Sequence, residues 1–126
     1  MNTLAKLFLS LGAISGALSV LLGAFGAHGL QHTLSEKMLK VFQTGVQYQF
    51  YHTFALLAVG LLALKFPSGL LTASGWSFCI GILLFSGSLY ALSTIGISKL
   101  GIITPIGGLF FIVGWALLAG SIIKAG

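Results

Sequence analysis

Histidine and glutamate side chains at helical spacing are the residues of this sequence whose types fit metal chemistry. His28, His32 and Glu36 follow one another at intervals of four residues, and His52 lies further along the chain. Imidazole and carboxylate groups are ligands for zinc and related ions. Such a site requires one unbroken helix from His28 to Glu36, whereas the two glycines beside His28 predict a break there. We therefore predict no metal and no cofactor, and keep these four residues as the less favoured alternative.

Histidine, amide and polar aromatic side chains indicate a second kind of site, a polar pocket. His28 ends the first long apolar run, and His52 lies about two turns into the second, on the same side of the protein. A polar side chain at membrane depth is costly, so it usually faces other helices or a wet cavity and has a partner. The residues predicted to line a ligand-binding pocket are His28, Gln43, Gln47, Tyr48, Tyr51, His52, Tyr90 and Thr104. A hydrogen-bond network that only joins the helices is the alternative left open.

Known catalytic constellations are missing from the sequence. It has no Ser/His/Asp set, no paired carboxylates, no cysteine-based metal motif and no glycine-rich phosphate loop. Glu36 is the single acid among 126 residues, so an acid-based proton relay has no material. We therefore expect a protein that is not an enzyme, and a metal-dependent membrane enzyme is the least favoured hypothesis.

The composition requires a membrane environment. Hydrophobic residues make up 57% of the chain and charged residues only 6%, and the mean hydropathy is +1.10. A soluble domain carries about 25% charged residues, so a soluble enzyme, a disordered tail and a nucleic-acid binder are excluded. We predict a single membrane domain over residues 1–126, with the lipid bilayer as its partner.

Four apolar runs are long enough to cross a bilayer, which takes about 20 residues in a helix. Short connections between them imply antiparallel neighbours with both termini on one side of the membrane. The dipeptide Thr104-Pro105 is typical of an N-cap followed by the first helical residue. The predicted fold is an all-α, four-transmembrane-helix antiparallel bundle with spans at 7–27, 46–64, 72–95 and 104–123.

An amphipathic segment at about 34–45 separates the first two spans. Wound as a helix, this region places its apolar and polar residues on opposite faces. We expect it to start along the membrane interface and to continue into the second span. Thr33 and Glu36 have the spacing of a capping box that would start this helix.

Small residues recur at helix-packing intervals in the apolar runs. In lipid, close backbone approach and van der Waals contact bring helices together. The glycines predicted to pack helices are Gly12, Gly16, Gly23, Gly81 and Gly108. Packing within one chain is the favoured interpretation, and a seam between copies of the chain is the alternative. The six lysines divide three to three between the two ends, so they leave the orientation undecided.

Four stretches of the chain resemble one family of small membrane proteins. They are GAFGAHGL at 23–30, QTGVQYQFYH at 43–52, LFSGSLYAL at 84–92 and TPIGGLFFIVGW at 104–115. The bacterial members form domain-of-unknown-function family 423, and the eukaryotic relatives are called transmembrane protein 256. The resemblance runs essentially end to end and implies a multi-pass protein of the bacterial inner or plasma membrane with no established activity. It also implies that the family's motif residues here are His28, Gln43, Gln47, Tyr48, His52, Ser86, Tyr90 and Pro105.

Two functional hypotheses follow from these patterns. The favoured one is a non-enzymatic accessory protein, or a helix bundle that binds a small ligand or lipid near His28 and His52. The alternative is a subunit of a small oligomeric transporter or channel, since the small-residue faces permit a homo-oligomer or a larger membrane complex.

Overall fold

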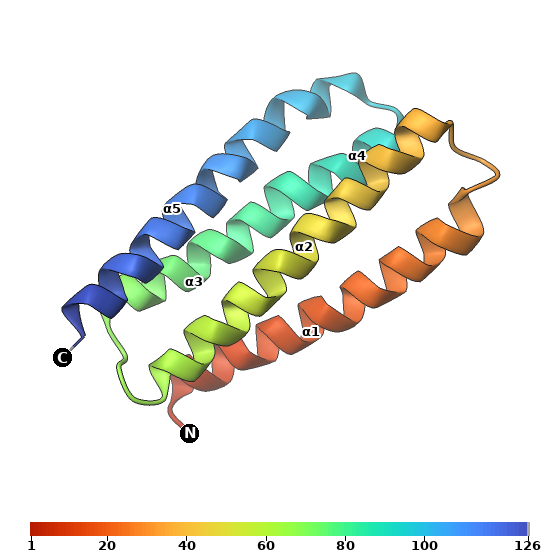
Figure 1. Ribbon diagram of the computed structural model, residues 1–126. Coiled ribbons are helices and arrows are strands. Elements are labelled where there is room, and N and C mark those ends of the chain that lie inside the picture. Colours follow the sequence, from red (N-terminus) through yellow and green to blue (C-terminus); the bar gives the residue numbers. More distant parts are fainter. Residues whose placement is uncertain (126) are drawn as a thin grey trace.

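Four long helices make up the computed structural model, which describes residues 1–125 (Figure 1). The first is α1 (Thr3–Phe25), extended by the π-helical turn η1 (Gly26–Leu30), and the second is α2 (Glu36–Ala63). The third consists of α3 (Gly69–Gly81), the π-helical turn η2 (Ile82–Ser86) and α4 (Gly87–Ile95). A 3₁₀ turn, η3 (Ser98–Ile102), leads into α5 (Ile103–Lys124). The prediction of an all-α protein with both termini at one end is confirmed.

Side-chain caps define where three of the helices begin. Asn2, Ser35 and Ser68 accept hydrogen bonds from backbone N–H groups in the first turns of α1, α2 and α3, at 2.8, 3.1 and 3.1 Å. Asn2 also donates from Nδ2 to the carbonyl oxygen of Ala63 at 2.8 Å, which joins the start of α1 to the end of α2. The third helix ends at Gly96, whose φ of 82° is left-handed and favours glycine.

Two predicted caps are wrong. The cap of α2 is Ser35, and the hydroxyl of Thr33 instead donates to the carbonyl oxygen of Leu30. Thr104 lies inside α5 because the preceding 3₁₀ turn already supplies the helix start. Pro105 is the third residue of α5, within the first turn, where a missing N–H group is tolerated.

By their main contacts the helices form a row, and side chains such as those of Phe8 (α1 to α3) and Trp115 (α5 to α2) also connect helices that are not neighbours in it. Along the row, α1 packs on α2, α2 packs on the third helix, and the third helix packs on α5, so that α1 and α5 lie at opposite edges (Figure 1). The buried apolar core lies mostly toward the end that carries the termini. Its members are Ala5, Phe8, Ala55, Leu56, Val59, Ala63, Leu71, Phe78, Phe111 and Leu118.

Glycines allow these close contacts. A Cβ atom added at Gly12 would lie 2.8 Å from Leu57, and one added at Gly16 would lie 3.3 Å from Thr53, so both glycines face α2 of the same chain. Of the other predicted packing glycines, Gly23 faces Val46 and Gly81 faces Phe111.

Gly108 is not a close-packing position. A Cβ added at Gly108 would meet nothing nearer than the Phe85 ring at 3.9 Å, whereas one added at Gly107 would overlap the Phe85 backbone. The glycine of close approach in α5 is therefore Gly107, one residue before the predicted position.

Three of the helices are long and apolar enough to cross a membrane: Thr3–Leu30, Gly69–Ile95 and Ser98–Lys124. The helix α2 differs because its first half is polar. The predicted amphipathic segment, 34–45, continues into the second predicted span as expected, since all but its first two residues belong to α2. The predicted break near His28 takes another form: Gly26 and Gly29 lie in the helical turn η1, and the chain leaves the helix only at 31–35.

Candidate functional site

His52 lies near the middle of α2 and is 4% exposed. Its Nδ1 is 2.7 Å from the carbonyl oxygen of Tyr48, and its Nε2 is 3.1 Å from Nε1 of Trp115 on α5. A carbonyl oxygen only accepts and an indole N–H only donates, so Nδ1 carries the proton and Nε2 accepts. Phe111 stacks on the imidazole with ring centroids 3.5 Å apart. These contacts hold His52 as one neutral tautomer between α2 and α5.

A groove of about 600 Å³ runs beside His52, between α2 and α5. We call it the α2–α5 groove. Phe85 of η2 packs against Tyr48 at a centroid distance of 4.7 Å, and it packs against Phe111 at 5.4 Å. The residues that line the groove are Tyr48, Tyr51, His52, Phe85, Pro105, Gly108, Leu109, Phe111, Ile112 and Trp115. The lining is almost wholly aromatic and aliphatic, Tyr48 and Tyr51 carry its hydroxyl groups, and no side chain in it is charged.

His28 does not share this site with His52. Along the α1–α2 contact, Gly26 faces Phe42 and Gly16 faces Thr53. His28 is therefore level with a residue about 11 positions before His52, which corresponds to roughly 16 Å along the helix axis. The reason is that residues 36–45 continue in line with the rest of α2 and pack along α1 instead of lying along the interface, so His52 lies deep within the helix instead of near its entrance. His28 itself is exposed on η1.

The structure places the other predicted pocket residues in three locations: at the α2–α5 groove, at the contact between α4 and α5, and in a separate polar network. Tyr48, Tyr51 and His52 line the α2–α5 groove, and the exposed Gln47 donates to the Tyr51 hydroxyl at 2.5 Å. Gln43, one turn before Gln47 on α2, is also exposed.

Thr104 lies apart from the groove. It pairs with the hydroxyl of Ser88 at 2.6 Å, and this contact joins α5 to α4.

Tyr90 belongs to a separate polar network, which lies between α2, α4 and α1. Its hydroxyl donates to Oε1 of Gln49 at 2.6 Å, and Gln49 is 4% exposed. Through Nε2, Gln49 donates to the carbonyl oxygen and the hydroxyl of Ser15 at 3.2 and 3.3 Å. The Ser15 hydroxyl also pairs with that of Thr53 at 2.7 Å. This network links α1, α2 and α4 at membrane depth.

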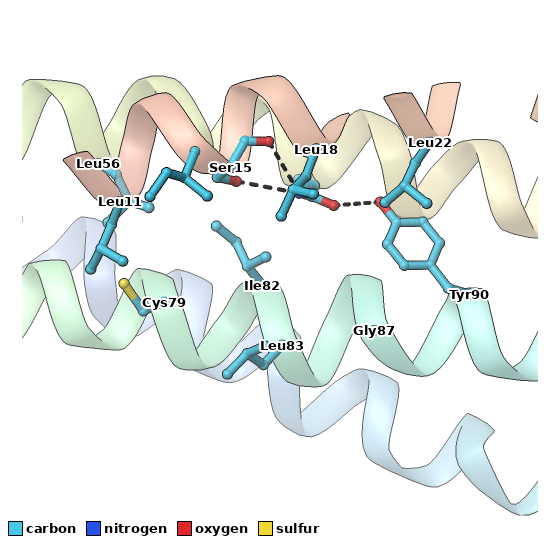
Figure 2. Close-up of a pocket in the computed structure, with 12 residues that line it drawn as sticks. Leu11, Ser15, Leu18, Leu22, Leu56, Cys79, Ile82, Leu83, Gly87 and Tyr90 are labelled. Carbon is cyan, nitrogen blue, oxygen red and sulfur yellow. Dashed lines mark hydrogen bonds between the residues drawn. The ribbon is translucent and has the colours of Figure 1, made fainter. Parts of the chain in front are cut away.

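A second groove, of about 360 Å³, lies over this network (Figure 2). We call it the α1–α4 groove. Leucine side chains of α1 face Cys79, Ile82 and Leu83 across it, and Tyr90 reaches from α4 toward the network. Because Ser15, Gln49 and Tyr90 are hydrogen-bonded to one another, the groove presents an almost wholly apolar surface.

The four residues of the metal alternative do not converge. His28 and His32 are exposed on η1 and in the turn after it, and Glu36 opens α2. Both ring nitrogens of His52 already have partners. Within residues 1–125, no group of three or more His, Cys, Asp or Glu side chains could hold a metal ion.

The sequence reasoning missed several residues of the site. Trp115 and Phe111 complete the His52 cluster from α5, and Gln49 organises the network with Tyr90. The signal for Gln49 is a seven-residue spacing of buried positions along α2: Phe42, Gln49, Leu56 and Ala63. No comparable signal marks Trp115, because α5 is apolar on all sides.

Fold and composition together define an α-helical integral membrane protein that exposes apolar side chains on the outside of its helices. The chain belongs to the family described as "Protein of unknown function (DUF423)", whose family model matches residues 22–108. This confirms the resemblance found in the sequence.

Relatives of similar length support the family assignment. The chain is 50% identical over 120 residues to the "UPF0382 membrane protein YwdK" of Bacillus subtilis, with 94% of this chain and 98% of the relative covered. It is 50% identical over 121 residues to a UPF0382 membrane protein of Haemophilus influenzae, with 94% of each covered. A UPF0382 membrane protein of Staphylococcus haemolyticus is 46% identical over 119 residues, with 94% of this chain and 97% of the relative covered. No solved structure matches the chain significantly. The protein is thus a membrane protein of the cell membrane.

Proposed function

We propose that this protein is a non-enzymatic membrane protein that holds a neutral lipid or small amphiphile in the α2–α5 groove. The observation that carries the proposal is the lining of that groove. It combines aromatic walls with two tyrosine hydroxyls, and no side chain in it is charged. Ligand pockets are commonly apolar with a few placed polar groups.

The proposal includes a bilayer crossing by α2, which gives four spans. The helix α1 and the third helix run in the same direction along the row. If both cross the bilayer, the chain between them must return across it, and α2 is the element that makes this connection. With 28 residues, α2 is about 42 Å long, enough for a hydrocarbon core of about 30 Å and a polar first part in the interface.

The range of membrane depth that the α2–α5 groove spans favours an amphiphile as its ligand. The groove extends from Pro105, in the first turn of α5, to Trp115 near the middle of that helix. One end therefore lies near the membrane interface and the other near the bilayer centre, which is how a lipid or another amphiphile is oriented. In this proposal His52 does not touch the ligand through a free nitrogen, and it positions Trp115 as part of the wall.

The test is native mass spectrometry of protein extracted gently from its own membrane, with two groove-filling variants. Gly108 lines the α2–α5 groove and Gly87 lines the α1–α4 groove, and a Cβ added at either position has at least 3.9 Å of free space. We expect a retained small molecule that Gly108→Phe removes and Gly87→Phe leaves in place. A bare wild-type protein, loss in Gly87→Phe alone, or equal loss in both variants contradicts the proposal.

The second candidate function is that of a subunit in a larger membrane assembly, and a polar surface of α2 favours it. An exposed stripe on the first half of α2 is polar, and it consists of Glu36, Lys40, Gln43, Gln47 and Tyr51. With the first part of α2 in the interface, Gln47 is the amide of this stripe that faces hydrocarbon, where an exposed amide is costly and can instead bond to a polar group on another helix. A subunit of a transporter or channel is expected to cover this stripe. A monomeric mass in nanodiscs, together with no flux in liposomes, contradicts this second candidate.

A further inference from the structure

The hydrogen-bonding groups of the α2–α5 groove restrict what its ligand can be. Within residues 1–125 the Tyr48 hydroxyl has no hydrogen-bond partner, and this side chain is 37% exposed. The Tyr51 hydroxyl accepts from Gln47, so its own proton is free to donate. Both nitrogens of His52 are occupied. The groove therefore offers two phenolic donors and no charge, which suits an uncharged ligand that carries acceptor oxygens.

The walls of the groove restrict the shape of the ligand. Tyr48 and Phe85 form one aromatic pair, and Phe111 and Trp115 flank His52 on the other side. Aromatic rings prefer offset-stacked or edge-to-face contacts with other flat rings. An acyl chain would gain burial here but would use neither the ring faces nor the donors. A flat ring uses both.

Access to the groove restricts how the ligand arrives. Gly108, Leu109 and Ile112 border the groove on α5, and the last two are exposed at 61% and 66%. An apolar tail can therefore lie along α5 while the ring packs against the outer side of the aromatic cluster that Tyr48, Phe85 and Phe111 form. A volume of about 600 Å³ is within the usual range for small-molecule sites.

We infer that the α2–α5 groove binds a quinone: a neutral flat ring with carbonyl oxygens that accept from Tyr48 and Tyr51, and with an apolar tail along α5. This inference rests on the proposed function and names the ligand class of that same site. It assigns binding only and includes no electron transfer.

The two tryptophans make the inference testable by fluorescence. Trp115 lines the groove, whereas Trp76 packs against Phe8 of α1, outside it. Trp76→Phe leaves Trp115 as the sole reporter, and Trp115→Phe leaves only Trp76 as the matched control. The probe is decyl-ubiquinone added to detergent-solubilised protein, since quinones quench indole fluorescence on close contact. Decylbenzene, which has a ring and tail but no acceptor oxygen, serves as the competitor.

We expect saturable quenching in Trp76→Phe and only weak, unsaturable quenching in Trp115→Phe. Loss of both hydroxyls in Tyr48→Phe/Tyr51→Phe keeps the rings and is expected to weaken binding about tenfold. Equal quenching of both tryptophans, no effect of the double variant, or displacement by decylbenzene at equal concentration overturns the quinone inference. If a retained lipid is still lost in Gly108→Phe, the proposed function survives that result. If nothing is retained and nothing quenches, both fail.

Discussion

Replacing Gln49 by leucine tests whether the buried network holds α1, α2 and α4 together. The substitution removes three hydrogen bonds, two to Ser15 and one from Tyr90. Ser15 keeps other partners, because its carbonyl oxygen accepts from Ser19 at 2.8 Å and its hydroxyl pairs with Thr53. Only the Tyr90 hydroxyl is left without an acceptor.

The expected loss of stability follows from these bonds. Side-chain hydrogen bonds between membrane helices average about 0.6 kcal/mol each, and an orphaned buried hydroxyl costs about 1–3 kcal/mol. We expect Gln49→Leu to lower the free energy of unfolding by about 2 kcal/mol. Adding Tyr90→Phe removes the orphaned hydroxyl, so Gln49→Leu/Tyr90→Phe is expected to recover about 1 kcal/mol of that loss.

The measurement is reversible unfolding in mixed micelles by titration with sodium dodecyl sulfate, followed by tryptophan fluorescence and circular dichroism. All four members of the double-mutant cycle are compared: wild type, the two single variants and the double variant. The reasoning is refuted if Gln49→Leu is as stable as wild type, or if the double variant is less stable than Gln49→Leu alone.

Two further predictions concern glycines, and each has a neighbouring control. Gly107→Ala is expected to destabilise the protein by about 1–3 kcal/mol, because its Cβ overlaps the Phe85 backbone, while Gly108→Ala has room and is expected to change little. The same unfolding titration measures both, and equal effects would show that α5 does not pack closely at Gly107. Gly96→Ala is expected to cost about 1 kcal/mol, because φ at Gly96 is 82°, whereas Gly101→Ala meets no atom within 4 Å. An unchanged midpoint for Gly96→Ala contradicts the left-handed end of the third helix.

The sequence predicted well where the helices lie along the chain, because the length and hydropathy of the apolar runs determine this. It predicted less well which face of each helix turns toward its neighbours. Gly107 and Gly108 differ by one residue, which is about 100° around a helix. Because α5 is apolar on every side, its sequence does not indicate which of these two glycines faces a neighbouring helix. In α2 the polar residues from Gln43 to His52 share one half of the helix except for Gln49, so their types indicated one site and not the separate network around Gln49.

The predicted pairing of His28 with His52 failed for a related reason. The sequence indicated a helix start near residues 33–36, but it did not indicate whether residues 36–45 lie along the interface or continue in line with the rest of α2. Because they continue in line, His52 is displaced toward the middle of the protein. The contacts of His52 with Trp115 and Phe111 depend on tertiary packing between α2 and α5, which no local pattern records.

The π-helical turn η2 has a consequence for how this family can vary in length. A π-helical turn accommodates one residue more than an α-helical turn, so it amounts to an insertion that the helix has absorbed. In α3, before this turn, a one-residue deletion would rotate everything beyond it by about 100° and separate Ser86 and Tyr90 from their partners on α2. Between Ile82 and Phe85, the same deletion can be taken up by closing the π-helical turn into an α-helical one. Relatives that differ from this chain by a single gap in the third helix should therefore carry that gap at η2.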